Sequence, residues 1–215
     1  MMNEKEISYQ VTNTYSTLNK LTPKTKNVWW VCHGIGYLSR YFITYFSSLN
    51  ADENYIIAPQ ASSKYYLKNE YKYVGASWLT KENTAQEIEN VLRNFDAIYQ
   101  AEQVPAHVNF YVLGFSQGVS VAMRWIARRK IVCDQLIIYA GSIPTELKKE
   151  DFSHIDTNET KIILIVGNRD EYLTEERMQL EHKKVQTLFG NEYIFDIFDG
   201  AHIMSRKVIE TLDKK

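Results

Sequence analysis

A serine flanked by glycines supplies the clearest chemistry in this 215-residue chain. Gly114 and Gly118 stand two positions before and after Ser116, in the pattern G-x-S-x-G. An apolar run at residues 108–113 precedes the pattern and a helical run at 119–129 follows it, which predicts a sharp strand–turn–helix connection. Such a turn lifts the serine hydroxyl clear of the backbone, and it needs residues without side chains where strand and helix pass close together. We therefore predict that Ser116 is a nucleophile; the alternative is a helix-capping serine in a glycine-rich connection.

A serine hydroxyl becomes a useful nucleophile when a base accepts its proton, and histidine is the predicted base. Of the five histidines, His202 follows the last predicted strand and precedes the last predicted helix, which places it at the carboxyl edge of the sheet with Ser116. The alternative for His202 is an ordinary surface-loop position. Among the other histidines, His33 precedes the serine and His107 lies at the opposite edge of the sheet. His154 lies in a polar loop, and His182 lies on a charged helix face that we expect to be solvated.

The base in turn needs a carboxylate that fixes its tautomer and stabilises its charged form. Asp170 follows the predicted strand at residues 162–166 by a short turn, and it stands between the serine and the histidine in the chain. This order of nucleophile, acid and base is found in one large class of serine hydrolases. Asp199 is the competitor, although a carboxylate only three residues from the histidine more naturally makes a local turn. Asp196 and Glu171 remain open as further alternatives.

Negative charge that develops on a substrate oxygen must meet preorganised N–H donors. The Gln117 amide, at the start of the predicted helix, is one candidate. The loop at residues 33–37 is expected to supply the second, and we assign it to the Ile35 amide. Gly34 and Gly36 would let the backbone turn this N–H into the site; the alternative is that they only form a turn before a helix.

Short apolar runs alternate with helical patterns, the rhythm of a mostly parallel sheet covered by helices. The runs are rich in Val, Ile, Leu, Tyr and Trp, as expected for strands buried on both faces. Predicted strands cover residues 28–32, 55–58, 108–113, 136–140, 162–166 and 193–198, with a looser antiparallel edge strand within 7–18. Predicted helices cover residues 38–49, 84–99, 119–129, 174–189 and 204–212, the second opened by a capping box of Thr84 and Glu87. The fold class that follows is α/β, a three-layer α/β/α sandwich.

The length and composition indicate one domain over residues 1–215. Apolar residues make up 45% and charged residues 24% of the chain, and the net charge is −1, so nothing favours nucleic acid or anionic lipid as a partner. The N-terminus lacks the apolar core of a signal peptide, and no run approaches the roughly 20 apolar residues that span a bilayer. Cys32 and Cys133 lie in or beside apolar runs, without metal-binding spacing. We expect a cytoplasmic protein with reduced thiols, no metal and no stable membrane association.

Two connections bear on access to the predicted site. Residues 59–79 lack clean periodicity and contain Trp78 and four tyrosines. Long irregular loops in compact domains are often functional, so this segment is predicted to form either an aromatic wall for an acyl or aryl group or a flap packed on the domain. Residues 141–160 can hold one short helix and a turn, which is too little for a helical lid. We therefore predict an open site and no large cap domain.

These motifs resemble the carboxylesterase/phospholipase-like branch of the α/β-hydrolases, which includes acyl-protein thioesterase-like enzymes. The similarity runs from residues 33–36 through the motif at 114–118 to Asp170 and residues 200–202, which is most of the chain. It implies an α/β-hydrolase fold, a triad of the serine, aspartate and histidine named above, an oxyanion hole built from the two amides, and no cofactor.

Three positions depart from the usual pattern of this branch. Tyr37 stands where an acidic residue is frequent, and Glu171 opens a segment that usually holds a hydrophobic residue and a proline. Trp78 is followed by Leu79 and Thr80 rather than by an aromatic residue and an aspartate. We expect Gly36, Tyr37 and Trp78 to contact the substrate. The predicted activity is cleavage of small or medium acyl esters, taken as small-molecule substrates, through an acyl-enzyme; thioesterase or lysophospholipase-like activity and a noncatalytic ligand-binding module are the alternatives.

Overall fold

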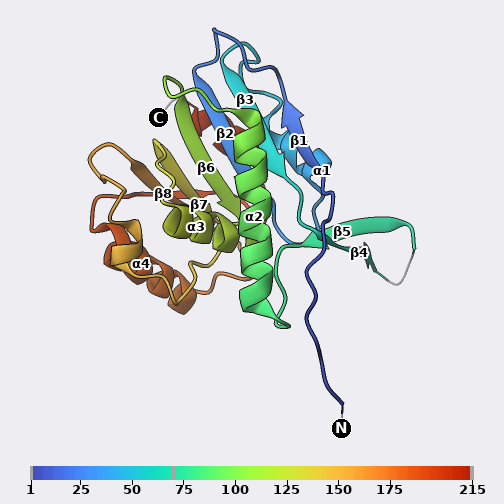
Figure 1. Ribbon diagram of the computed structural model, residues 1–215. Coiled ribbons are helices and arrows are strands. Elements are labelled where there is room, and N and C mark those ends of the chain that lie inside the picture. Colours follow the sequence, from blue (N-terminus) through green and yellow to red (C-terminus); the bar gives the residue numbers. More distant parts are fainter. Residues whose placement is uncertain (1, 69–70, 214–215) are drawn as a thin grey trace.

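The computed structural model describes residues 2–68 and 71–213, and within them a central sheet has seven strands (Figure 1). All neighbouring strands are parallel except for the first pair. The six strands predicted from apolar runs are confirmed to within two residues at each end. In spatial order, the strands are β1 (Tyr15–Leu18), β3 (Asn54–Pro59), β2 (Asn27–Cys32), β6 (Asn109–Phe115), β7 (Gln135–Tyr139), β8 (Lys161–Gly167) and β9 (Ile194–Phe198).

The antiparallel edge strand predicted within residues 7–18 is confirmed only in its last third. β1 pairs with β3, but the segment before it has no strand structure. Ile7, Tyr9 and Val11 alternate as a strand would, yet their exposed fractions are 84%, 81% and 73%. Alternation favours a strand where one face has a surface to cover, and this segment has none.

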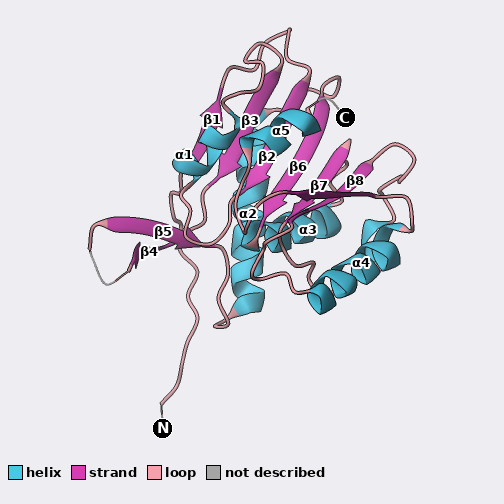
Figure 2. Ribbon diagram, turned by 180° about the vertical axis from the view of Figure 1, so that it is seen from behind, coloured by secondary structure: helices cyan, strands magenta, loops and turns pink. Residues whose placement is uncertain are grey.

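Helices cover both faces of the sheet, which confirms the three-layer α/β/α prediction. On one face, α2 (Thr84–Glu102), α3 (Gln117–Arg129) and α4 (Glu175–Phe189) bury their apolar sides in one large core (Figure 1). On the opposite face, α1 (Ser39–Phe42) and α5 (Arg206–Leu212) enclose a second core (Figure 2). The helices therefore cover both faces of the central strands, which are buried over nearly their whole length.

Two details of the predicted helices are wrong. The single helix expected at residues 38–49 is split into α1 and a 3₁₀ turn, Ile43–Phe46. The capping box at the start of α2 does not form: Asn83 occupies the cap position without a side-chain bond, and the Glu87 carboxylate instead accepts the Thr80 N–H at 3.1 Å. The Glu87 side chain therefore binds the loop that precedes α2 rather than the cap residue of the helix.

The segment at residues 59–79 is not an irregular loop. It contains an antiparallel hairpin, β4 (Ser63–Leu67) and β5 (Tyr73–Ser77), which projects from the body of the molecule (Figures 1 and 2). Tyr65, Tyr66 and Tyr73 are 41%, 53% and 51% exposed. Because neither face of the hairpin is fully buried, its sequence lacks the alternation that marks a strand in a core.

The connection from β7 to β8 holds one 3₁₀ turn, Lys149–Phe152, and no lid helix, which confirms that a large cap domain is lacking in the described chain. Cys32 and Cys133 are buried and unpaired, as predicted. None of the helices in the described residues combines the length and the apolar character needed to cross a bilayer.

Candidate active site

The turn from β6 into α3 holds Ser116 in a backbone conformation that is costly for a residue with a side chain, with φ 53° and ψ −120°. The two glycines allow the close contacts that the turn needs. A Cβ on Gly114 would lie 2.5 Å from the Val119 Cα, and a Cβ on Gly118 would lie 2.1 Å from the Cys32 carbonyl oxygen. The Ser116 side chain makes no capping bond to α3, which argues against the helix-cap alternative.

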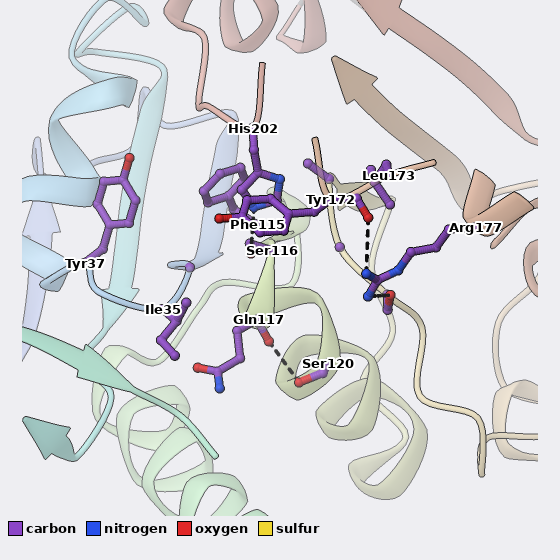
Figure 3. Close-up of a pocket in the computed structure, with 14 residues that line it drawn as sticks. Ile35, Tyr37, Phe115, Ser116, Gln117, Ser120, Tyr172, Leu173, Arg177 and His202 are labelled. Carbon is purple, nitrogen blue, oxygen red and sulfur yellow. Dashed lines mark hydrogen bonds between the residues drawn. The ribbon is translucent and has the colours of Figure 1, made fainter. Parts of the chain in front are cut away.

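Ser116, His202 and Asp170 are brought together in one hydrogen-bonded chain. The His202 Nε2 atom lies 2.9 Å from Ser116 Oγ (Figure 3), and His202 Nδ1 lies 2.7 Å from Asp170 Oδ2. The Asp170 side chain is fully buried, and its second oxygen accepts the Tyr172 N–H at 2.9 Å. A carboxylate at Nδ1 favours the proton on that nitrogen, which leaves Nε2 to accept the serine hydroxyl proton.

The loops that carry the acid and the base are fastened to one another. Gly167, the last residue of β8, approaches so closely that a Cβ there would lie 2.3 Å from the Gly200 carbonyl oxygen. That oxygen accepts the Arg169 N–H at 2.9 Å, and the Gly200 N–H donates to the Asn168 side chain at 3.1 Å. The carboxyl ends of β8 and β9 therefore hold the aspartate and the histidine as one unit.

The competing carboxylates lie elsewhere. Asp199 pairs with Arg169 at 3.1 Å, and the two side chains are 77% and 68% exposed. Glu171 is exposed, and Asp196 lies within β9 opposite Ile165. Asp170 is the carboxylate that contacts the histidine.

His33, the buried histidine after β2, has a different setting. Its Nδ1–H donates to the Gly34 carbonyl oxygen at 2.8 Å, and its Nε2 accepts the Ala61 N–H at 3.2 Å. Burial lowers the pKa of His33 to about 4, which keeps the ring neutral. Both ring nitrogens are occupied by the backbone, so His33 joins two loops rather than serving as a base.

The remaining histidines are also placed by the structure. His107 is exposed before β6, at the opposite sheet edge, and the half-buried His154 bonds the Ile131 carbonyl at 3.1 Å. The expectation that His182 is solvated is wrong. Its ring is half-buried, bonds the Tyr193 hydroxyl and lies 4.2 Å from the Phe195 ring.

The two predicted oxyanion amides border the space beside the serine. Ile35 and Gln117 both line the cavity there (Figure 3), and neither N–H donates to an acceptor in the described chain. Gln117 is also the first residue of α3, so the positive end of the helix dipole adds to its field. Gly34 brings the other loop close, because a Cβ there would lie 3.2 Å from the Ser116 Cβ.

The prediction that Trp78 contacts substrate is corrected. Trp78 is 1% exposed and does not line the cavity. Its Nε1–H donates to the His33 carbonyl at 2.7 Å, and its backbone N–H donates to the Gln117 side chain at 2.8 Å. Gly36 also lies outside the cavity lining; its φ is +85° and its N–H donates to the Ala76 carbonyl at 2.9 Å. Both residues hold the loop after β2 in place.

A cavity of about 480 Å³ opens at the serine, a size typical of small-molecule sites. Ile35 and Tyr37 lie on one side of Ser116 and Arg177 on the other (Figure 3). Tyr37 is thus placed where substrate contact was predicted. In the described chain, His, Cys, Asp and Glu side chains form no group of three or more that could hold a metal ion.

Several lining residues had not been predicted. They come from the ends of β6 and β7, from the first turn of α3, from the segment after Asp170 and from α4: Phe115, Ser120, Ala140, Gly141, Ser142, Tyr172, Leu173 and Arg177. Residues 141–160 are predicted only as a connection, and Arg177 lies within the helix predicted at residues 174–189. Parallel strands bring the ends of β7 and β8 to one edge, but no local pattern marks these particular residues as lining a cavity.

Comparisons with known proteins agree with this architecture. The profile of the phospholipase/carboxylesterase family matches residues 13–214. No curated protein matches the chain significantly.

Among solved structures, an acyl-protein thioesterase 2 from Zea mays is similar with a TM-score of 0.68 and 13% identity, over 94% of this chain and 97% of that one. A phospholipase/carboxylesterase from Dyadobacter fermentans is similar with a TM-score of 0.66 and 21% identity, over 97% of this chain and 98% of that one. At these identities the structural likeness shows the α/β-hydrolase fold, which confirms the fold expected from the sequence motifs. The family match covers nearly the whole chain, and the chain therefore belongs to the phospholipase/carboxylesterase family, whose members are esterase- and thioesterase-type α/β-hydrolases.

Proposed function

We propose that this protein is a serine esterase that cleaves small or medium acyl esters through a covalent acyl-enzyme. The observation that carries the proposal is the hydrogen-bonded chain from Ser116 through His202 to Asp170. Each group has the partner that its role needs, and the serine opens onto a cavity.

In the first half of the reaction, Ser116 Oγ attacks the ester carbonyl carbon while His202 Nε2 takes the hydroxyl proton. The oxygen of the tetrahedral intermediate becomes negatively charged and accepts hydrogen bonds from the Ile35 and Gln117 amides. Asp170 stabilises the imidazolium that forms. The imidazolium then gives its proton to the departing alcohol, and the acyl group remains on Ser116.

In the second half, a water molecule replaces the alcohol. His202 accepts a proton from the water, the resulting hydroxide attacks the acyl carbon, and the same two amides stabilise the second tetrahedral intermediate. Collapse of this intermediate releases the carboxylic acid and returns the proton to Ser116. The cycle needs no cofactor.

The size of the cavity and the short β7–β8 connection support small, accessible substrates. Because the described chain has no lid helix between β7 and β8, we expect no closed state that a lipid interface must open. We expect saturable kinetics on short-chain esters and no jump in rate when a substrate passes its solubility limit. Thioester cleavage uses the same steps, and a solved neighbour is named as an acyl-protein thioesterase. A matched panel of esters and thioesters therefore ranks the two substrate classes.

The test compares wild type with Ser116→Ala in the hydrolysis of 4-nitrophenyl butyrate, with the exposed Ser153→Ala as a matched control. The Ser116 variant should lose activity by several orders of magnitude while its thermal midpoint stays close to that of wild type. The control should retain wild-type activity. Normal turnover by Ser116→Ala would refute the proposal, and a folded wild type inactive on every ester and thioester would favour a noncatalytic binding module.

The cellular setting belongs to the same proposal. Two buried, unpaired cysteines support a reducing compartment, and we propose the cytoplasm. The proposed partner is a small-molecule ester rather than nucleic acid or a membrane surface.

A further inference from the structure

A cation that the reaction described above does not use lies in the exposed part of the lining of the cavity at Ser116. Arg177 lies in the first turns of α4, and its side chain reaches into the cavity lining (Figure 3). One terminal nitrogen of its guanidinium donates to the Tyr172 carbonyl oxygen at 3.1 Å, and the other donates to Ser142 Oγ at 2.9 Å. These two anchors come from the loops after β8 and β7, so the guanidinium is held from two directions.

Both anchors are neutral, so neither of them balances the charge of Arg177. Within the described chain, no acidic oxygen lies within ion-pair distance of this guanidinium, although Glu175 and Glu176 are close in sequence. Three cations on neighbouring segments do have carboxylate partners: Arg169 with Asp199, Arg124 with Glu146 and Lys184 with Glu181.

The guanidinium also keeps donors to spare. An arginine side chain has five N–H groups in a planar fork, and two of them serve the anchors here. The Ser142 hydroxyl accepts from Arg177, which leaves its own proton to donate. A planar anion placed in the cavity would therefore meet several donors that need no rearrangement.

The two anchors of Arg177 lie beside the serine and the histidine of the site. Gly141, next to the Ser142 anchor, lies so close to the nucleophile that a Cβ there would be 2.3 Å from the Ser116 carbonyl oxygen. The Tyr172 ring, on the other anchor, lies 4.9 Å from the His202 ring. The cation thus lies across the cavity from Ile35 and Tyr37, with the serine between them (Figure 3).

We propose that Arg177 binds a carboxylate carried by the substrate, so that the preferred esters bear an acid group on one side of the scissile bond and an apolar group on the other. This inference rests on the proposed esterase function and adds its substrate class. A single arginine matches a monoanionic, planar carboxylate, which it can bind through two parallel hydrogen bonds. Neutral esters fit the same cavity without an interaction with this guanidinium.

The experiment uses matched pairs of esters, with the acid on the acyl side or on the alcohol side. The 4-nitrophenyl monoester of glutaric acid is compared with 4-nitrophenyl butyrate, and 3-(butanoyloxy)benzoate is compared with phenyl butyrate. For each pair, the readout is the ratio of kcat/KM for the acid ester to kcat/KM for the neutral ester. Wild type should favour the acid ester in at least one pair, and less so as added salt screens the charge.

Arg177→Gln should reduce that ratio by about tenfold to a hundredfold, the range for a hydrogen-bonded ion pair. Arg177→Lys keeps the charge but not the planar fork, so its ratio should lie between those of wild type and Arg177→Gln. Arg93→Gln is the matched control, because it removes one positive charge from an exposed position on α2 and should leave both ratios unchanged. Unchanged ratios in Arg177→Gln, with hydrolysis still dependent on Ser116, would overturn the inference and leave the proposed function standing.

Calorimetry with glutarate tests the anion site without turnover, in case no ester is cleaved. Binding to wild type that is lost in Arg177→Gln and kept in Arg93→Gln supports the carboxylate site. Absence of binding to wild type, or equal binding to wild type and to Arg177→Gln, overturns it.

Discussion

Two loops at the carboxyl edge of the sheet each carry a histidine, and the two side chains have opposite settings. His33, after β2, is buried with both ring nitrogens bonded to the backbone. His202, after β9, is partly exposed with one nitrogen on a carboxylate and the other on a serine hydroxyl. Burial among fixed backbone partners makes the first ring a neutral structural link, whereas a carboxylate and an open cavity suit the second for proton transfer. The partners of a histidine, rather than its presence at this edge, decide its role.

Replacing each ring should show the difference between the two histidines most clearly. His202→Ala should reduce kcat/KM on 4-nitrophenyl butyrate by about 10⁴, because the members of a triad act as a unit, and its thermal midpoint should barely move. His33→Gln should instead lose about 1–3 kcal/mol of stability through disturbed buried hydrogen bonds, and the folded fraction should remain far more active than His202→Ala. Kinetics and thermal unfolding on both variants provide the test. Equal losses of activity in the two folded variants would contradict the distinction.

The second prediction concerns the carboxylate that distinguishes His202 from His33. Asp170→Asn should lower kcat at least about a hundredfold, because the amide no longer selects the useful tautomer. Asp199→Asn, which removes only an exposed ion pair with Arg169, should cost less than about tenfold. Steady-state kinetics of the two variants decide the matter, and the reverse ranking would assign the acid to Asp199.

The third prediction uses pH. Burial lowers the pKa of His33 from its ordinary value of 6.5 to about 4, so between these values the unfolded chain binds more protons than the folded one. The contribution of His33 to stability is therefore complete above about pH 6.5 and is lost as the pH falls toward 4. Over this interval, the free energy of unfolding of wild type should fall by up to about 3 kcal/mol more than that of His33→Gln, as measured by denaturant unfolding. Parallel pH dependences for the two proteins would show that His33 is not buried in its neutral form.

The smallest effect is expected at Trp78, which supports the His33 loop. Trp78→Phe removes the bond to the His33 carbonyl and should cost about 1–2 kcal/mol of stability. Acyl-chain preference should be unchanged, because the ring lies outside the cavity. A panel of 4-nitrophenyl esters from acetate to octanoate measures this preference. A clear shift in the preferred acyl-chain length, with the stability of the protein unaltered, would indicate that Trp78 contacts the substrate after all.

The parts of the fold and site that could be predicted are those with a local physical signature. Central strands buried on both faces are continuous apolar runs, so their positions could be assigned closely. The turn at Ser116 needs glycines on both sides, and the structure shows the contacts that require them. Asp170 and His202 follow the ends of strands, and parallel strands bring such ends to one edge.

The parts that could not be predicted depend on tertiary contacts or on the absence of burial. The exposed β4–β5 hairpin lacks alternation because no core imposes it. Trp78 was expected in the cavity because it lies in a loop near the site, but its indole N–H binds a backbone carbonyl inside the core. Arg177 occupies an ordinary position in an amphipathic helix, and only the packing of α4 beside the loops after β7 and β8 brings it to the serine.

The most direct test of the central claim is covalent labelling with a fluorophosphonate, followed by mass spectrometry of the digested protein. An activated serine attacks phosphorus and displaces fluoride, and the adduct survives digestion. We predict one adduct per chain, on the peptide that contains Ser116. Labelling should be absent in Ser116→Ala, much slower in His202→Ala and as fast as in wild type in His33→Gln. An adduct on another residue, or labelling of Ser116 at the same rate in His202→Ala as in wild type, would contradict the claim that His202 activates Ser116.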